Sequence, residues 1–121
     1  ARIAAPPEPA DLLYAPDAGR AIEACVSART LPHDRYHVVG HRSSLADLAR
    51  ALTAVDPEVR VEVESGGAAA GREPSASAPA LPAMSTARIE RDLGFRPEYD
   101  ARRAAADYLG WLRARGEAGT P

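Results

Sequence analysis

The sequence predicts a small α/β fold, and three observations support that prediction. Segments with strand-like character alternate along the chain with segments whose apolar residues recur at helical spacing. The connections are short, apart from residues 66–82, which are rich in Gly, Ala, Ser and Pro. With 121 residues, 45% of them apolar, the chain is long enough for one modest domain. The expected order is strand, helix, strand, helix, strand, loop, helix, helix.

The first third of the chain contains one expected helix between short strands. Arg2–Ala4 is strand-like, and since no methionine precedes it, we interpret this as a broken start. Residues 11–14 predict a second short strand. A helix should begin at Pro16 and end near Arg29, with Asp17 as its cap or in its first turn. Its apolar face is expected to comprise Ala18, Ala21, Ile22, Cys25 and Val26.

The middle of the chain carries the clearest helix. Residues 36–39 are β-rich and stop at Gly40, which predicts a strand. Ser43 or Ser44 can cap the helix that follows, and Asp56-Pro57 should end it. Residues 59–64 alternate strictly between apolar and charged side chains, which predicts a half-buried strand. The apolar stripe of the helix consists of Leu45, Leu48, Ala49, Leu52 and Val55.

Two helices are expected near the C-terminus. Ser85 should cap a short helix that contains Ile89 and Leu93, and Gly94 should terminate it. The last helix begins near Asp100, and residues 116–121 should fray. Its expected stripe consists of Ala104, Ala105, Tyr108, Leu109 and Leu112, with Trp111 beside it.

Composition excludes several functions. The net charge is −2 and no basic block is present, which argues against a nucleic-acid partner. No apolar run reaches membrane-spanning length and no signal peptide is recognisable, so we expect a cytoplasmic protein without a membrane partner. All 15 basic residues are arginine. Without lysine, this chain cannot form a Schiff base, a phosphate-loop lysine contact or a Tyr-x-x-x-Lys dyad.

Three histidines, His33, His37 and His41, are spaced four residues apart. On a helix this spacing would suggest a metal site. The surrounding residues predict a strand instead, where four residues span roughly 13 Å, too far for one ion. We therefore expect two histidines at loop ends and one on a strand, and no metal site.

The other candidate motifs have structural explanations. The glycines of residues 66–71 lack the spacing of a dinucleotide loop and predict flexibility. Cys25 is expected to be a buried small hydrophobe. Ser43, Ser44 and Ser85 stand where helix caps belong, and no catalytic residue is predicted. Arg72 lies alone among small residues, where it could either hold an anionic substrate group or be solvated.

Four blocks of sequence carry a family resemblance. Residues 11–22 (DLLYAPDAGRAI) resemble a strand-to-helix segment of extended short-chain dehydrogenases/reductases, the NAD-dependent epimerase/dehydratase family. Residues 36–40 (YHVVG) and 44–48 (SLADL) are similar to the strand and helix that follow there. Residues 85–97 (STARIERDLGFRP) resemble the family's S-x-A…L-G-[WF]-x-P block. In the family, as in this chain, a helix that contains a tryptophan follows this block. Together these blocks cover residues 11 to about 113.

The resemblance implies a Rossmann-type parent protein that uses NAD or NADP. Its glycine-rich cofactor loop and its catalytic Ser/Thr, Tyr and Lys would lie upstream of the matched region, so this chain alone should bind no cofactor. Residues 1–43 would form the end of the cofactor-domain sheet with a connecting helix. Residues 44–115 would form the substrate-binding lobe, and residues 116–121 a disordered tail.

Departures from the family pattern bear on the substrate. Ala10 stands where nucleotide-sugar epimerases often carry arginine, and Ala83 where an aspartate is usual. Arg72 matches the arginine of the family's R-x-x-D pattern, but Ser75 replaces the aspartate. The resemblance thus assigns substrate binding to Arg72 and Ser75. The lost charges favour a smaller sugar, sugar acid or other carbonyl or hydroxyl compound over a nucleotide diphosphate sugar.

The expected function is therefore that of a fragment of an NAD(P)-dependent epimerase, dehydratase or reductase that contributes substrate binding. The intact protein can also form a homodimer, as many members of the family do. The alternative is a stand-alone, non-catalytic binding or interaction module of the same fold. As a fragment, the chain should be poorly stable or self-associating when isolated.

Overall fold

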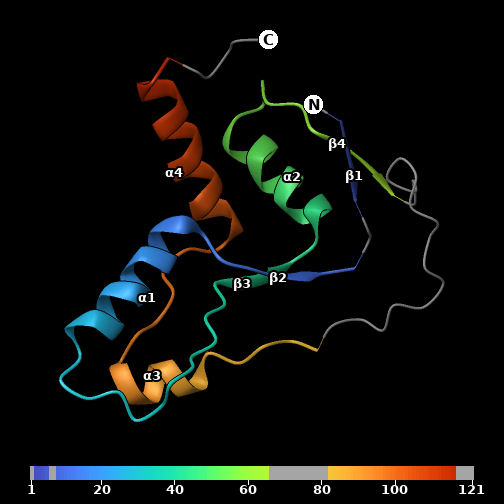
Figure 1. The fold of residues 1–121 in the computed structure, drawn as a ribbon. Coiled ribbons are helices and arrows are strands. Elements are labelled where there is room, and N and C mark those ends of the chain that lie inside the picture. The colour runs from blue at the N-terminus through green and yellow to red at the C-terminus, as the bar shows by residue number, and fades with distance from the viewer. Residues whose placement is uncertain (1, 6–7, 66–81, 117–121) are drawn as a thin grey trace. The chain divides into compact units, whose positions relative to one another are not determined.

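The computed structural model describes residues 2–5, 8–65 and 82–116. The chain forms two compact units, each built from separate stretches of sequence. We call them the α2–α4 unit (residues 1–9, 43–80 and 101–121) and the α1–α3 unit (residues 10–42 and 81–100). In chain order the elements are β1 (Arg2–Ala5), β2 (Ala10–Leu12), α1 (Ala15–Ser27), β3 (His41–Ser43), α2 (Leu45–Val55), β4 (Glu62–Ser65), α3 (Ala87–Leu93) and α4 (Ala101–Ala114) (Figure 1).

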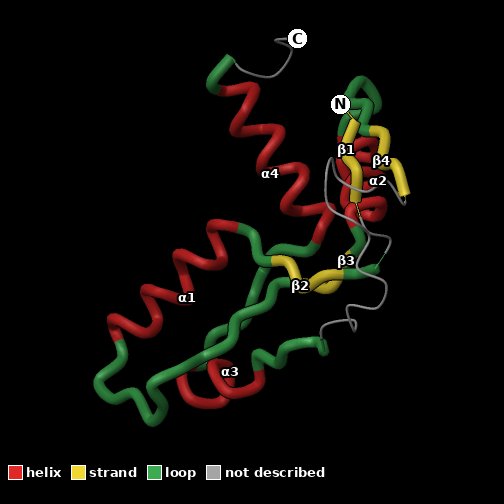
Figure 2. The backbone as a smooth tube through the Cα atoms, turned by 45° about the vertical axis from the view of Figure 1, so that its right-hand side comes forward, coloured by secondary structure: helices red, strands yellow, loops and turns green. Residues whose placement is uncertain are grey.

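In the α2–α4 unit, β1 and β4 pair in parallel, from Arg2 opposite Glu62 to Ala5 opposite Ser65 (Figure 2). The predicted alternation over residues 59–64 is confirmed, because Val61 and Val63 are half-buried while Glu62 and Glu64 are exposed. The strand itself begins only at Glu62. A parallel pair needs a long crossover, which here contains α2.

Helix α2 has the predicted start and end. Ser44 is the N-cap: its Oγ accepts a hydrogen bond from Asp47 N at 3.1 Å, and its own N–H donates to Asp47 Oδ2 at 3.2 Å. This reciprocal pair is a capping box, with Asp in the position more often held by Glu or Gln. At the other end Asp56 N donates to Leu52 O at 2.9 Å, so the helix stops before Pro57, as predicted.

Helix α2 lies between α4 and the β1–β4 pair (Figure 1). Ala49 of α2 and Ala104, Ala105 and Leu109 of α4 are buried. The small alanine side chains allow the helices to approach closely. The predicted α4 stripe is confirmed at these three α4 positions but wrong at Tyr108. Tyr108 is 46% exposed and stacks on Trp111, with ring centroids 6.0 Å apart.

In the α1–α3 unit, the strand predicted at residues 36–39 is wrong. Those residues form no strand, and β3 begins later, at His41, where it neighbours β2. Val38 and Val39 are half-buried. Their β-branched side chains therefore fit a partly buried surface, although their backbone forms no strand. Pairing starts where Gly40 N donates to Leu12 O at 2.8 Å. A Cβ at residue 40 would lie 3.0 Å from that oxygen, which is tighter than most real Cβ contacts, so the close approach favours glycine.

The core of the α1–α3 unit forms where α1 meets α3. Ala21, Ile89 and Phe95 are buried there, and the partly buried hydrophobic residues around them are Ala24, Cys25, Tyr36, Val38 and Leu93. Gly94 ends α3 with a left-handed φ of 66°, as predicted. The N-cap of α3 is Thr86 rather than Ser85, although Ser85 Oγ still accepts from Ala87 N at 3.2 Å.

Asp17 joins the start of α1 to the segment that follows α3. Its side chain is fully buried, and it accepts hydrogen bonds from Glu98 N at 3.1 Å and Tyr99 N at 3.0 Å. Arg20 Nη1 lies 2.7 Å from its Oδ1. Asp17 is in the first helical turn, as expected, but its backbone partners are distant in sequence. Asp17 was expected to act within its own helix, but its carboxylate forms a tertiary contact between α1 and the segment after α3.

Candidate functional site

An apolar groove of about 450 Å³ lies on the α1–α3 unit. Every residue of the apolar face predicted for α1 lines it. The prediction of that face is confirmed, but three side chains that border the groove are not covered: Ile22 is 65% exposed, Val26 80% and Leu31 50%. Large apolar side chains that gather on one exposed face are typical of binding surfaces.

His33, Asp34 and Tyr36 also line the groove, and two of them bond to Asp92 of α3. Both bonds go to Asp92 Oδ2, from His33 Nδ1 at 2.7 Å and from the Tyr36 hydroxyl at 3.2 Å. Arg91 Nε donates to Asp92 Oδ1 at 2.9 Å. An ionised carboxylate only accepts hydrogen bonds, so His33 donates from Nδ1.

The electrostatics of this cluster favour a charged Asp92 and a neutral Tyr36. Burial tends to raise the pKa of Asp92, but the hydrogen bonds from His33, Arg91 and Tyr36 and the charge of Arg91 outweigh it, so the pKa is lowered from 3.8. Burial, together with the nearby Asp92 carboxylate, raises the pKa of Tyr36 above 10.0. The Tyr36 hydroxyl therefore stays protonated and donates a hydrogen bond to Asp92.

Asp92 should make the stability of the chain depend on pH. The pKa of Asp92 is lower in the folded chain than its ordinary value of 3.8. Its contribution to the free energy of unfolding is therefore present above pH 3.8, and it is lost as the pH falls through the pKa of the folded chain. We expect Asp92→Asn to lower the urea midpoint at pH 7 and to flatten its decline in acid. Urea titrations between about pH 2 and 7 measure this. The exposed Asp34→Asn is the control, and an equal effect of both variants would contradict the role of Asp92.

The three histidines do not lie together as ligands. His33 bonds to Asp92, His37 is exposed in a non-strand segment, and His41 is the histidine on a strand. The prediction placed His37 on the strand and His41 at a loop end, which is wrong because pairing with β2 begins only at Gly40 and His41 is the first residue of β3. Both ring nitrogens of His41 are buried, without a hydrogen-bond partner in the described ranges. Within those ranges, no group of three or more His, Cys, Asp or Glu side chains could hold a metal ion.

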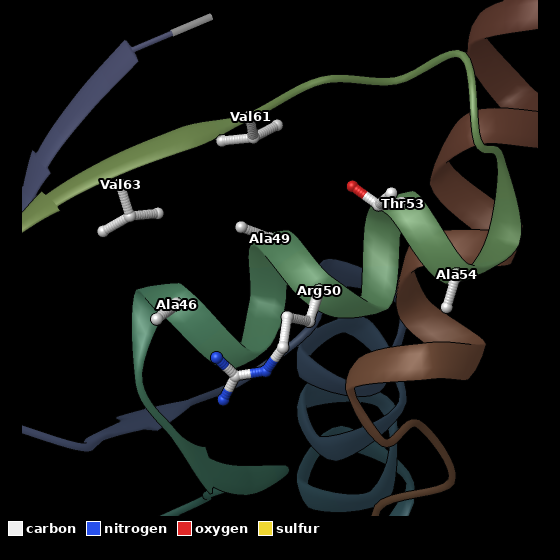
Figure 3. A pocket seen from close by; sticks show the side chains of 7 residues that line it. All are labelled: Ala46, Ala49, Arg50, Thr53, Ala54, Val61 and Val63. Carbon is white, nitrogen blue, oxygen red and sulfur yellow. The ribbon is translucent and has the colours of Figure 1, made fainter.

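A second pocket, of about 510 Å³, lies within the α2–α4 unit (Figure 3). Ala46, Ala49 and Thr53 of α2 line it together with Val61 and Val63. Figure 3 shows these two valines opposite the helix, Val63 on β4 and Val61 just before it. Arg50 borders it and forms an ion pair with Asp47. Its one charged residue is already paired, and its other lining residues are small or apolar. This pocket could therefore make mainly apolar contacts with a ligand.

The predicted substrate residues fall outside the described residues. Arg72 and Ser75, and the glycines between 66 and 71, all lie in the stretch 66–81. Their assignment stays a prediction. Ala10, at the start of β2, and Ala83 are both exposed. Cys25 is half-buried rather than fully buried, because it lies where the core meets the groove.

The candidate residues that sequence inspection missed are Asp92 and Tyr36. Asp92 follows Ile89 by three residues, so both lie on neighbouring positions of one helix face. That spacing could have placed Asp92 near the core side of α3. Its partners come from a loop almost 60 residues earlier, which no local pattern indicates.

Comparisons with known proteins identify a fold rather than a family. No protein-family model and no curated protein matches the chain. No helix in the described part of the chain is long and apolar enough to cross a membrane.

Among solved structures, the chain is similar to the X-ray structure of L-threonine dehydrogenase from the hospital pathogen Clostridium difficile, with a TM-score of 0.68 and 17% sequence identity. The match covers 97% of this chain but 37% of the dehydrogenase chain. The protein therefore has a small α/β fold that resembles part of a dehydrogenase structure.

Proposed function

We propose that this chain is the substrate-side part of an NAD(P)-dependent oxidoreductase related to the short-chain dehydrogenases/reductases. The observation that carries the proposal is the match of nearly the whole chain to a minor part of one dehydrogenase. In this proposal the cofactor loop and the catalytic Tyr and Lys belong to sequence outside these 121 residues. The complete absence of lysine from the chain is consistent with that division.

Three of the four sequence blocks that resemble the family coincide with observed elements, whereas the block at residues 36–40, matched to a strand, forms none. The block at residues 44–48 contains the cap and first turn of α2, and the block at residues 85–97 spans α3 and its Gly94 terminator. The block at residues 11–22 contains Asp17, which holds the segment after α3. These three blocks and the likeness of the fold to part of a dehydrogenase support the same kind of parent protein.

A small hydroxyl-bearing substrate suits the residues best. The substrate named for the similar enzyme, L-threonine, carries a hydroxyl and a carboxylate. Arg72 would bind an anionic group such as a carboxylate with paired N–H donors, and Ser75 would add a hydrogen bond. Exchange of a hydride between a hydroxyl carbon and nicotinamide is the reaction that we propose for the whole protein. This chain would contribute substrate contacts and not the acid–base step.

The polypeptide encoded by the whole gene tests the proposal. We expect it to carry a G-x-x-G-x-x-G segment and a Y-x-x-x-K segment before residue 1, and to reduce NAD or NADP with a small hydroxy acid. An encoded polypeptide that lacks both motifs and binds no nucleotide would overturn the proposal. It would make the non-catalytic binding module the better description.

Arg72 provides the residue-level test in that polypeptide. Arg72→Ala should raise the KM for substrate on the order of 10-fold or more, because a hydrogen-bonded charge pair is lost. The exposed Arg102→Ala, on α4, is the control for loss of one arginine. Equal KM values for Arg72→Ala and the unmodified polypeptide would remove Arg72 from the substrate site.

A further inference from the structure

Helix α4 carries two aromatic side chains that its own unit leaves about half exposed. Tyr108 is 46% exposed and Trp111 is 49% exposed, and their rings stack with an interplanar angle of 18°. The Cζ atom of Arg115 lies 4.7 Å from the centroid of the Trp111 ring. Tryptophan, tyrosine and arginine are the residue types that most often dominate the energy of protein–protein contacts. The cluster therefore has the composition of an interaction surface.

Trp111 is the centre of a ridge of exposed side chains on α4. Asp107, Trp111 and Arg115 follow one another at intervals of four residues, and all three are exposed. Side chains at this interval form one ridge on the surface of a helix. Two helices that align such ridges cross at about −50°, the commonest packing angle in globular proteins. The ridge on α4 has a negative end, an aromatic centre and a positive end.

This charge pattern is complementary to itself. When a second copy of α4 lies antiparallel across a twofold axis at Trp111, Asp107 of each copy faces Arg115 of the other. The two tryptophan rings then meet at the centre and remove each other's apolar surface from water. A parallel arrangement would instead bring Asp107 to Asp107 and Arg115 to Arg115. The pattern thus favours one occupant of the ridge, a second copy of this chain in the antiparallel orientation.

We propose that the Asp107–Trp111–Arg115 ridge of α4 is the contact through which two copies of this chain associate. The contact involves no cofactor or substrate, so it does not depend on the proposed function. One pair of helices buries less than the roughly 1,600 Å² of a standard interface, so the Kd should be on the order of 100 μM. The exposed face of α1 that contains Ile22 and Val26 is the competing contact, and the experiment separates the two.

Two charge reversals test the proposal in the 121-residue chain. Asp107→Arg brings two arginines to each facing position, and Arg115→Asp brings two aspartates. Each variant alone should raise the Kd on the order of 10-fold or more, because like charges that face each other repel. An equal mixture of the two variants restores both pairs of opposite charges and should associate about as tightly as the unmodified chain. Mixing could not restore a contact made within one chain. Sedimentation velocity over a range of concentrations measures the association.

Trp111 reports on the contact directly, because it is the single tryptophan of these 121 residues. Its fluorescence should shift to shorter wavelength as the concentration of the unmodified chain rises, and also when the two charge variants are mixed. Trp111→Ala should raise the Kd on the order of 30-fold. Arg102→Asp is the matched control for Arg115→Asp, since it reverses an exposed arginine nine residues from Trp111, on the opposite side of α4. It should leave the Kd nearly unchanged.

Three results would overturn the proposal. The first is an unmodified chain that stays monomeric at every concentration up to about 1 mM. The second is a mixture of Asp107→Arg and Arg115→Asp that associates no better than either variant alone. The third is a loss of association in Val26→Asp, or a loss in Arg102→Asp that equals the loss in Arg115→Asp. The former would place the contact on α1, and the latter would show an effect of net charge rather than of the ridge.

Discussion

Asp17→Asn is expected to lower the free energy of unfolding by about 3 kcal/mol. The wild-type carboxylate is fully buried and accepts hydrogen bonds from two backbone amides, those of Glu98 and Tyr99. An asparagine of the same shape has only one acceptor oxygen, and its NH2 group would face a backbone donor. Even if its oxygen takes the place of Oδ2 and accepts from both amides, its NH2 group would face Arg20 Nη1, and Arg20 would lose its buried countercharge.

Urea unfolding followed by circular dichroism measures the effect of Asp17→Asn. Glu23→Gln is the matched control, since it removes one negative charge from an exposed position of the same helix. The control should change stability by less than about 0.5 kcal/mol. A loss below about 1 kcal/mol for Asp17→Asn would show that the negative charge of Asp17 contributes little to holding this segment, in contradiction to the role described here.

Ile89→Ala should cost a similar amount, about 3 kcal/mol, through loss of packing. Ile89 is 1% exposed and lies in the core of the α1–α3 unit with Ala21 and Phe95. Truncation removes three carbon atoms from a site closed by Ala21 and Phe95 and leaves a cavity there. The loss is large beside the 5–15 kcal/mol by which most domains are stable, roughly a fifth or more of it.

A graded series checks that packing causes the loss. Ile89→Val should cost only about 1 kcal/mol, because a single methyl group is removed. Val26→Ala in the 121-residue chain serves as the exposed control, and it should cost little because Val26 is 80% exposed. Equal costs for Ile89→Ala and Val26→Ala in the same urea titration would contradict the assignment of the core.

Local chemistry made several elements predictable. Helix α2 begins at a serine that can cap it and ends before Asp56-Pro57, and both signals depend only on adjacent residues. The left-handed Gly94 at the end of α3 is predictable for the same reason. Alternation over residues 59–64 correctly gave the half-buried side of that segment, since burial follows the pattern even where no strand forms.

Properties set by distant partners were not predictable. Residues 36–39 have β-rich composition, but where a ladder starts depends on the partner strand, and β2 pairs only from Gly40 onward. The roles of Asp17 and Asp92 likewise depend on residues far away in the sequence. The apolar face of α1 was correctly identified from its periodicity, but periodicity does not reveal what covers a face, and Ile22 and Val26 are exposed.

Titration of NAD and NADP against the 121-residue chain by calorimetry tests the central claim most directly. We expect no binding of either nucleotide to this chain and clear binding to the polypeptide encoded by the whole gene. Micromolar binding to the 121 residues alone would contradict it, because the chain would then contain a cofactor site of its own and would not be only the substrate-side part of an oxidoreductase.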